Sequence, residues 1–133
     1  MGNVLALDVG TVRIGVAMAD LAVPIAFPVT TLVVDGSEVD AIKRLVAEKS
    51  VDTIIVGYPR NQSGDPTAQT VLVKEFTQKL QDLATIVFQD ESLTSVTAEN
   101  HLKASGKPYT KADIDAKAAA IILQDYLEAA YHA

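Results

Sequence analysis

Cysteine and tryptophan are absent from this chain of 133 residues, and histidine occurs only twice. The lack of cysteine excludes a disulfide framework, a thiolate zinc site and a cysteine nucleophile, and it fits a reducing cytoplasm. Two histidines provide few nitrogen ligands for zinc. Any metal site is therefore expected to use oxygen ligands.

Long apolar runs are also missing. The first apolar stretch begins at Val4 and is interrupted by Asp8. It is too short for a membrane span or for the apolar region of a signal peptide, and no positive charge precedes it. We therefore expect a cytoplasmic protein with no membrane association.

Positive charge is scarce, because 11 Lys and Arg residues stand against 17 Asp and Glu residues, a net charge of −6. This balance disfavours a general nucleic-acid coat but does not exclude a nuclease. Residues 101–117 reverse the sign, since four lysines minus two aspartates gives +2: Lys103, Lys107, Lys111 and Lys117 against Asp113 and Asp115. This stretch is either a solvated surface or a patch that faces phosphates, with Lys107 and Lys111 as candidate contacts.

The composition that remains is typical of one folded domain. Hydrophobic residues make up 49% of the chain and charged residues 21%, close to the average for globular proteins. A chain of this length buries roughly two thirds of its unfolded surface in one core. We expect residues 1–133 to form a single domain.

The hydrophobic pattern predicts three strands, then a helix, a strand, a helix, a strand and two helices. Alternating or β-branched runs predict strands at residues 4–9, 14–19, within 26–34, at 52–57 and at 84–88. Three-and-four spacing predicts helices at 37–49, with Ser37 as the cap, at 71–83, at 95–102 and from 110 onward. This order favours a mixed sheet, antiparallel at its start and parallel later, with helices on its faces.

The start of the last helix carries a capping signal. Thr110 and Asp113 have the spacing of a capping box, which places Asp115 in the second turn. At 100° per residue, Asp115 shares a face with Ala118 and Ile122, the side expected to pack on the sheet, whereas Asp113 points elsewhere.

Three acidic residues are unusual for their positions: Asp8, Glu91 and Asp115. Each lies either where the hydrophobic pattern predicts a buried, packed side chain or at the end of a predicted strand. An ionised carboxylate out of water is costly unless it is paired or binds a metal. If the three converge, Mg²⁺ or Mn²⁺ suits them best, because these ions prefer oxygen ligands.

Each of these acids also has an ordinary interpretation. Asp8 could be a hydrogen-bonded turn former for Gly10 and Thr11, and Glu91 could be a solvated strand end. Asp115 could simply interact with the dipole of its helix. The pattern alone leaves these alternatives open.

Four blocks of the sequence resemble, in the same order, the motifs of the YqgF family of RuvX-like proteins. They read LALDVGTVRIGVA (5–17), VGYPRNQSG (56–64), DESLT (90–94) and IDAKAAAIIL (114–123). The resemblance spans nearly the whole chain. It implies an α/β, RNase H-like fold with a five-stranded mixed sheet and helices on both faces.

The resemblance also implies a catalytic site that binds divalent metal. Asp8, Glu91 and Asp115 match the family's catalytic and metal-binding positions, and Asp90 is a weaker candidate than its neighbour Glu91. A two-ion Mg²⁺ or Mn²⁺ site is expected, with Asp8 between ions roughly 4 Å apart.

The family implies cleavage of nucleic acid. Processing of the 5′ end of pre-16S rRNA during ribosome biogenesis is the first expectation, and resolution of Holliday junctions in branched DNA is the alternative. We expect a monomer or a homodimer. A non-catalytic RNA- or ribosome-binding module is a third possibility, since Ser92 replaces the arginine that usually follows the Asp-Glu pair.

Several residues are candidates for contacts with the phosphate backbone. They are Arg13, Arg60 and Asn61, together with Lys107 and Lys111. Arg13 could equally be a plain hairpin charge, and Arg60, where the family usually has an apolar residue, could be an ordinary loop residue. The aromatic residues are scattered, so a base-stacking platform is not predicted.

The first block has one further resemblance. Asp-x-Gly-Thr after an apolar strand is also similar to the phosphate loop of actin-like ATPases and sugar kinases. Those proteins enclose a nucleotide between two such domains, whereas this sequence provides one and lacks a Walker A motif. The nuclease interpretation is therefore preferred.

Overall fold

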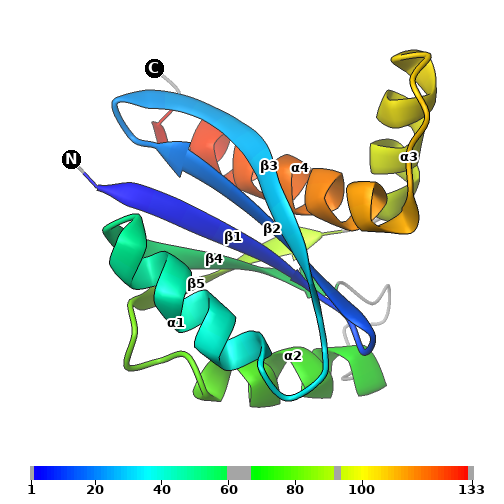
Figure 1. Ribbon diagram of the computed structural model, residues 1–133. Helices are drawn as coiled ribbons and strands as arrows, with labels where there is room; N and C mark the ends of the chain where they lie inside the picture. The colour runs from blue at the N-terminus through cyan, green and yellow to red at the C-terminus, as the bar shows by residue number, and fades with distance from the viewer. Residues whose placement is uncertain (1, 60–66, 92–93, 132–133) are drawn as a thin grey trace.

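The structure is a computed structural model that describes residues 2–59, 67–91 and 94–131, without the side chains of residues 91, 94–96 and 131 (Figure 1). In chain order the elements are β1 (Asn3–Val9), β2 (Arg13–Asp20), β3 (Val23–Val33), α1 (Glu38–Glu48), β4 (Val51–Pro59), α2 (Ala68–Gln78), β5 (Thr85–Glu91), α3 (Thr94–Ala104) and α4 (Lys111–Tyr131). This is the element order predicted from the sequence.

The five strands form one mixed sheet in the order β3-β2-β1-β4-β5. The first three strands are antiparallel, and β1, β4 and β5 run parallel to one another. In the β1–β2 pair, Asp8 lies opposite Gly15. The predicted change from antiparallel to parallel pairing is confirmed, and β1 lies at the centre where the two halves meet.

Helices cover both faces of the sheet, as predicted (Figure 1). The odd-numbered residues of β1, such as Leu5 and Leu7, belong to the core under α1 and α2. The even-numbered residues Val4 and Ala6 belong to the core under α4. Because neighbouring residues of a strand face opposite sides, Asp8 lies on the α4 face.

Helix α4 packs close to the sheet because the residues between them are small. Ala118 and Ala119 are fully buried, and a Cβ added to Gly15 would overlap the carbonyl oxygen of Asp115. Helix α3 contacts α4 and stands away from the sheet (Figure 1). The segment from α3 through the connection to α4, residues 94–110, is called the α3 arm below.

Some local predictions need correction. The hydroxyl of Ser37 does not cap α1 but donates to Asp35, while Glu38 accepts from the backbone N–H groups of Asp35 and Gly36. Helix α2 begins three residues earlier than predicted because Thr67 and Thr70 form a capping box.

All five strands extend beyond their predicted bounds, most clearly β3, β4 and β5. Strand β3 begins at Val23 and includes Pro24 and Pro28, where it leaves regular register with β2. Strand β5 continues to Glu91 because it keeps pairing with β4 as far as Pro59. None of the helices in the described part of the chain combines the length and apolar character needed to cross a bilayer.

Candidate active site

Asp8 is the penultimate residue of β1, and its partly buried side chain is on the α4 face. The strand end is held from two sides. Gly10 donates its N–H to the carbonyl of Arg13 (3.0 Å), and the amide of Gln69 donates to the carbonyl of Val9 (2.7 Å). Within the described residues the Asp8 carboxylate makes no hydrogen bond to this turn, so the turn-former interpretation of Asp8 is wrong.

Asp115 reaches the same face of the sheet from α4. The predicted capping box is confirmed, because Thr110 N–H donates to the Asp113 carboxylate (2.8 Å) and Asp113 N–H donates to the Thr110 hydroxyl (3.2 Å). This fixes the start of the helix. Asp115 lies on the same face of α4 as the buried Ala118 and Ala119, and its side chain is 20% exposed. Asp113, by contrast, is exposed.

The charge of Asp115 acts on the Asp8 carboxylate. Burial, and then the charge of Asp115, raise the pKa of Asp8 from 3.8 to about 6. No cation or hydrogen-bond donor of the described residues compensates the Asp8 carboxylate. A buried acid left uncompensated beside another acid is unfavourable in the metal-free protein, and these two oxygen-donor groups fit a hard divalent cation.

Arg13 provides a counter-charge to Asp115. It is the first residue of β2, and its Nε donates to Asp115 Oδ2 over 2.5 Å. The sequence predicts either a substrate contact or a plain hairpin charge for Arg13, and gives no sign of this pair. The two residues are 102 positions apart, so no local pattern could have indicated their contact.

The third predicted acid, Glu91, is the last residue of β5 and pairs with Pro59. Its side chain lies outside the described residues, as do Arg60, Asn61 and Ser92. Asp90 pairs with Tyr58, which packs against the core under α1 and α2, so Asp90 lies on the face opposite Asp8. Among the described residues, no group of three or more His, Asp or Glu could hold a metal ion.

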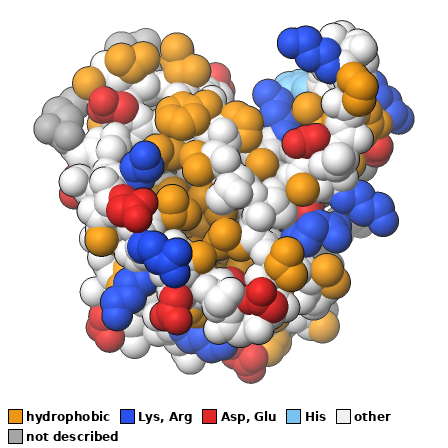
Figure 2. Space-filling view, viewed as in Figure 1, with side chains coloured by type: hydrophobic (Ala, Val, Ile, Leu, Met, Phe, Trp, Pro, Cys, Tyr) orange, Lys and Arg blue, Asp and Glu red, His pale blue; other side chains and the backbone are white. Residues whose placement is uncertain are grey.

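The predicted basic stretch belongs to the α3 arm and the start of α4. Lys103, Lys107 and Lys111 are all exposed. Figure 2 shows Lys and Arg side chains on the arm and near its base, and a notch between the arm and the body of the molecule. The arm leads directly into α4, the helix that carries Asp115, so Lys111 lies one turn before Asp115 on the same helix.

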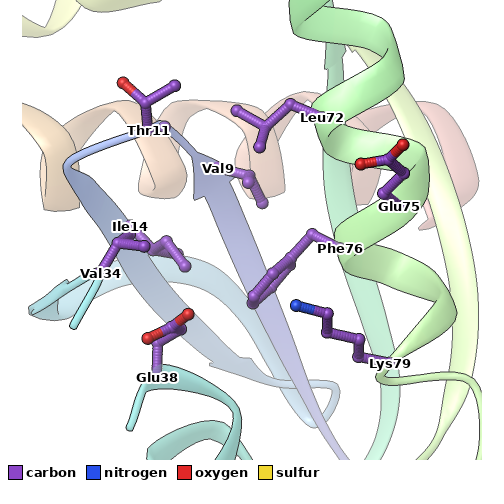
Figure 3. Close-up of a pocket in the computed structure, with 10 residues that line it drawn as sticks. Val9, Thr11, Ile14, Val34, Glu38, Leu72, Glu75, Phe76 and Lys79 are labelled. Carbon is purple, nitrogen blue, oxygen red and sulfur yellow. The ribbon is translucent and has the colours of Figure 1, made fainter. Parts of the chain in front are cut away.

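A separate cavity of about 130 Å³ lies on the other face of the sheet, between the β1–β2 turn, α1 and α2 (Figure 3). Apolar side chains such as Ile14 and Phe76 line it, with Glu38 on one side and Glu75 and Lys79 on the other. Neither Asp8 nor Asp115 takes part in it. The cavity and the acidic pair are therefore distinct features.

Two aromatic residues that are far apart in the sequence meet in the fold. The rings of Tyr58 and Phe88 pack edge to face with centroids 5.4 Å apart, and Lys74 Nζ lies 5.7 Å from the Tyr58 centroid. Strand pairing between β4 and β5 produces this contact, which sequence reasoning missed. The pair is on the face opposite Asp8.

Comparison with solved structures identifies the class of fold. The chain superposes on RuvC of Thermus thermophilus with a TM-score of 0.56 and 11% identity, covering 96% of this chain and 95% of that one. RuvC of the same species in complex with a Holliday junction substrate gives a TM-score of 0.59 at 12% identity, covering 98% of both chains. The predicted RNase H-like fold is thereby confirmed.

Sequence comparison then gives the family. The RuvX family, described as Holliday junction resolvase, matches residues 2–129. A Chloroflexus aurantiacus protein is 44% identical over 95% of this chain and 86% of its own length, and a Dechloromonas aromatica protein is 38% identical over 99% and 94%. Both are named "Putative pre-16S rRNA nuclease". The chain belongs to the RuvX family, as the sequence motifs indicated.

Proposed function

We propose that this protein is a divalent-metal-dependent nuclease that processes the 5′ end of pre-16S rRNA. The observation that carries the proposal is the pair of carboxylates, Asp8 and Asp115, on one face of the sheet. No positively charged side chain among the described residues pairs with Asp8, and burial and the charge of Asp115 raise the pKa of Asp8. The names of the relatives supply the substrate.

We assign the metal site to Asp8, Asp115 and Glu91. Glu91 is included because it is the last residue of β5, and the carboxyl ends of the parallel strands β1, β4 and β5 lie on the same side of the sheet. Asp90 is excluded because it lies on the opposite face. Mg²⁺ or Mn²⁺ fits this all-oxygen set.

The protein residues have two roles in this mechanism. The three carboxylates hold the metal, while Arg13, Arg60, Asn61, Lys107 and Lys111 bind the phosphate backbone and fix its register against the acids. When bound, the metal stabilises the negative charge that develops at the cleaved phosphate and lowers the pKa of the attacking water. The exposed lysines partly offset the net charge of −6, which otherwise repels nucleic acid.

Cleavage of a four-way DNA junction is the second candidate. It is favoured by the description of the family as Holliday junction resolvase. The same carboxylates would serve both reactions, so the candidates differ in the shape of the substrate. Junction resolution further requires two active sites, which a homodimer would provide and a monomer would not.

The test is a cleavage assay with a precursor 16S rRNA 5′ segment beside a four-way DNA junction, in Mg²⁺, Mn²⁺ or EDTA. We expect the wild type to cleave the RNA only with metal, and a folded Asp8→Asn variant to be inactive. Preferential cleavage of the junction would favour the second candidate. Cleavage of neither substrate by folded wild type would contradict the proposal and leave a non-catalytic RNA- or ribosome-binding module.

A further inference from the structure

The Arg13–Asp115 pair uses only part of what each group offers. Nε of Arg13 makes the contact with Asp115 Oδ2, while a guanidinium carries five N–H donors. Its terminal nitrogens contact no acceptor among the described residues. The side chains of Arg13 and Asp115 are 35% and 20% exposed, so solvent reaches both partners of the pair.

The contact between Arg13 and Asp115 is also of a kind in which another cation can replace the guanidinium. It is a single contact and not the bidentate fork that gives the strongest arginine–carboxylate pairs. Ion pairs that solvent reaches contribute little to stability, since water screens them. A cation with a higher charge and a second carboxylate ligand can therefore compete with the guanidinium for Asp115.

Asp8 supplies that second carboxylate. Its cross-strand partner Gly15 lies directly under the backbone carbonyl of Asp115, and among the described residues Arg13 forms an ion pair with Asp115 alone. A divalent ion held by Asp8 and Asp115 would meet two obstacles from Arg13: one oxygen of Asp115 is occupied, and the guanidinium repels the ion. Ion binding therefore opposes the Arg13–Asp115 contact.

We propose that Arg13 is a resident counter-cation of Asp115 that a divalent ion displaces, so that metal binding releases the guanidinium to a phosphate oxygen of the substrate. This inference rests on the proposed function, because it requires a metal at Asp8 and Asp115. Metal binding then precedes substrate binding. Without metal, Arg13 neutralises the charge of Asp115; with metal bound, Arg13 contacts the substrate. Released guanidinium groups are well suited to phosphate oxygens.

The inference predicts opposite effects of one substitution on two measurements. Arg13→Gln removes both the competition for Asp115 and the repulsion, so Mn²⁺ should bind at least threefold more tightly. The same variant loses a phosphate contact, so its KM for substrate should rise. A residue that only oriented Asp115 would give the reverse effect on Mn²⁺, because its loss would weaken the site.

Isothermal titration with Mn²⁺ on wild type, Arg13→Gln, Arg13→Lys and Asp8→Asn tests this directly. We expect tighter binding by Arg13→Gln, affinity within about twofold of wild type for Arg13→Lys, which keeps the charge, and at least tenfold weaker binding by Asp8→Asn. Unchanged or weaker binding by Arg13→Gln would overturn the inference while leaving the nuclease proposal standing. If Asp8→Asn binds Mn²⁺ as well as wild type, the metal site itself is wrong, and both fail.

A second measurement on the wild type avoids any question of misfolding in a variant. The chain contains three arginines, Arg13, Arg44 and Arg60, so the arginine Nε–H region of an NMR spectrum has few signals. The Arg13 signal should be shifted by its ion pair in EDTA and should move toward the solvent-exposed position on addition of Mg²⁺. A signal that stays in place when Mg²⁺ saturates the site would overturn the inference.

Discussion

The backbone carbonyl of Asp115 lies directly over Gly15, which is itself the cross-strand partner of Asp8. This contact sets the separation between α4 and the sheet, and so between the two carboxylates. A Cβ at position 15 would overlap backbone atoms, which cannot move aside as the end of a side chain can. Gly15 thus controls the geometry of the site without taking part in its chemistry.

Gly15→Ala should therefore destabilise the protein by about 1–3 kcal/mol, the usual range for overpacking. Gly2→Ala is a matched control, because the atoms nearest to its added Cβ belong to the side chain of the exposed Asp52, which can rotate away. We expect the control to change the free energy of unfolding by less than about 0.5 kcal/mol. Urea denaturation of both variants checks this, and equal effects would argue against close packing at Gly15.

The raised pKa of Asp8 predicts how stability depends on pH in EDTA. Below its unfolded value of 3.8 the group is protonated in both states and costs nothing. Between 3.8 and the folded value of about 6 the unfolded state ionises while the native state keeps its proton, so stability falls across this range and levels off above it. Asp8→Asn has no such group, so its stability advantage over wild type should grow by about 2 kcal/mol between pH 4.5 and 7.5.

Urea denaturation of wild type and Asp8→Asn at these two pH values measures the effect. Other titrating groups are common to both proteins, so they largely cancel in the comparison. Saturating Mn²⁺ should reverse the order of stability at pH 7.5, because only the wild type retains the full site. An advantage of Asp8→Asn that does not change with pH would show that the Asp8 carboxylate is not perturbed.

The basic residues of the α3 arm and of the start of α4 predict a change in salt dependence. If Lys107 and Lys111 each contact a phosphate, the Lys107→Gln/Lys111→Gln variant should reduce the slope of log affinity against log salt by about 1.4 for single-stranded RNA. Lys43→Gln/Lys49→Gln removes two exposed lysines from the region of α1, on the other face, and serves as the control. Equal slopes for the two variants would exclude a specific role for the arm.

The features of the fold and site that can be predicted from the sequence depend on local patterns. Asp8 stood out because it interrupts an apolar strand. The Thr110–Asp113 box gave the start of α4, and helical periodicity then placed Asp115 toward the sheet. Each of these features needs only a few neighbouring residues, and the structure bears out the strand, the capping box and the helical face.

The parts that were not predictable depend on contacts between distant segments. The Arg13–Asp115 pair joins residues 102 positions apart, and the role of Gly15 depends on where α4 crosses β2. The Ser37 prediction failed for a local reason, because the Asp35 carboxylate takes the hydroxyl hydrogen bond and Glu38 accepts from the neighbouring N–H groups. Propensity alone does not decide between such competing local partners.

The most direct test of the central claim compares two aspartates of the same helix. Asp115 faces Asp8, whereas Asp113 is exposed and caps the helix, a role that asparagine can largely retain. With precursor 16S rRNA and Mn²⁺, Asp115→Asn should cleave at least about 100-fold more slowly than wild type, as expected for a lost metal ligand, while Asp113→Asn should stay within about threefold. Wild-type cleavage by a folded Asp115→Asn variant would contradict the assignment of this carboxylate to the active site.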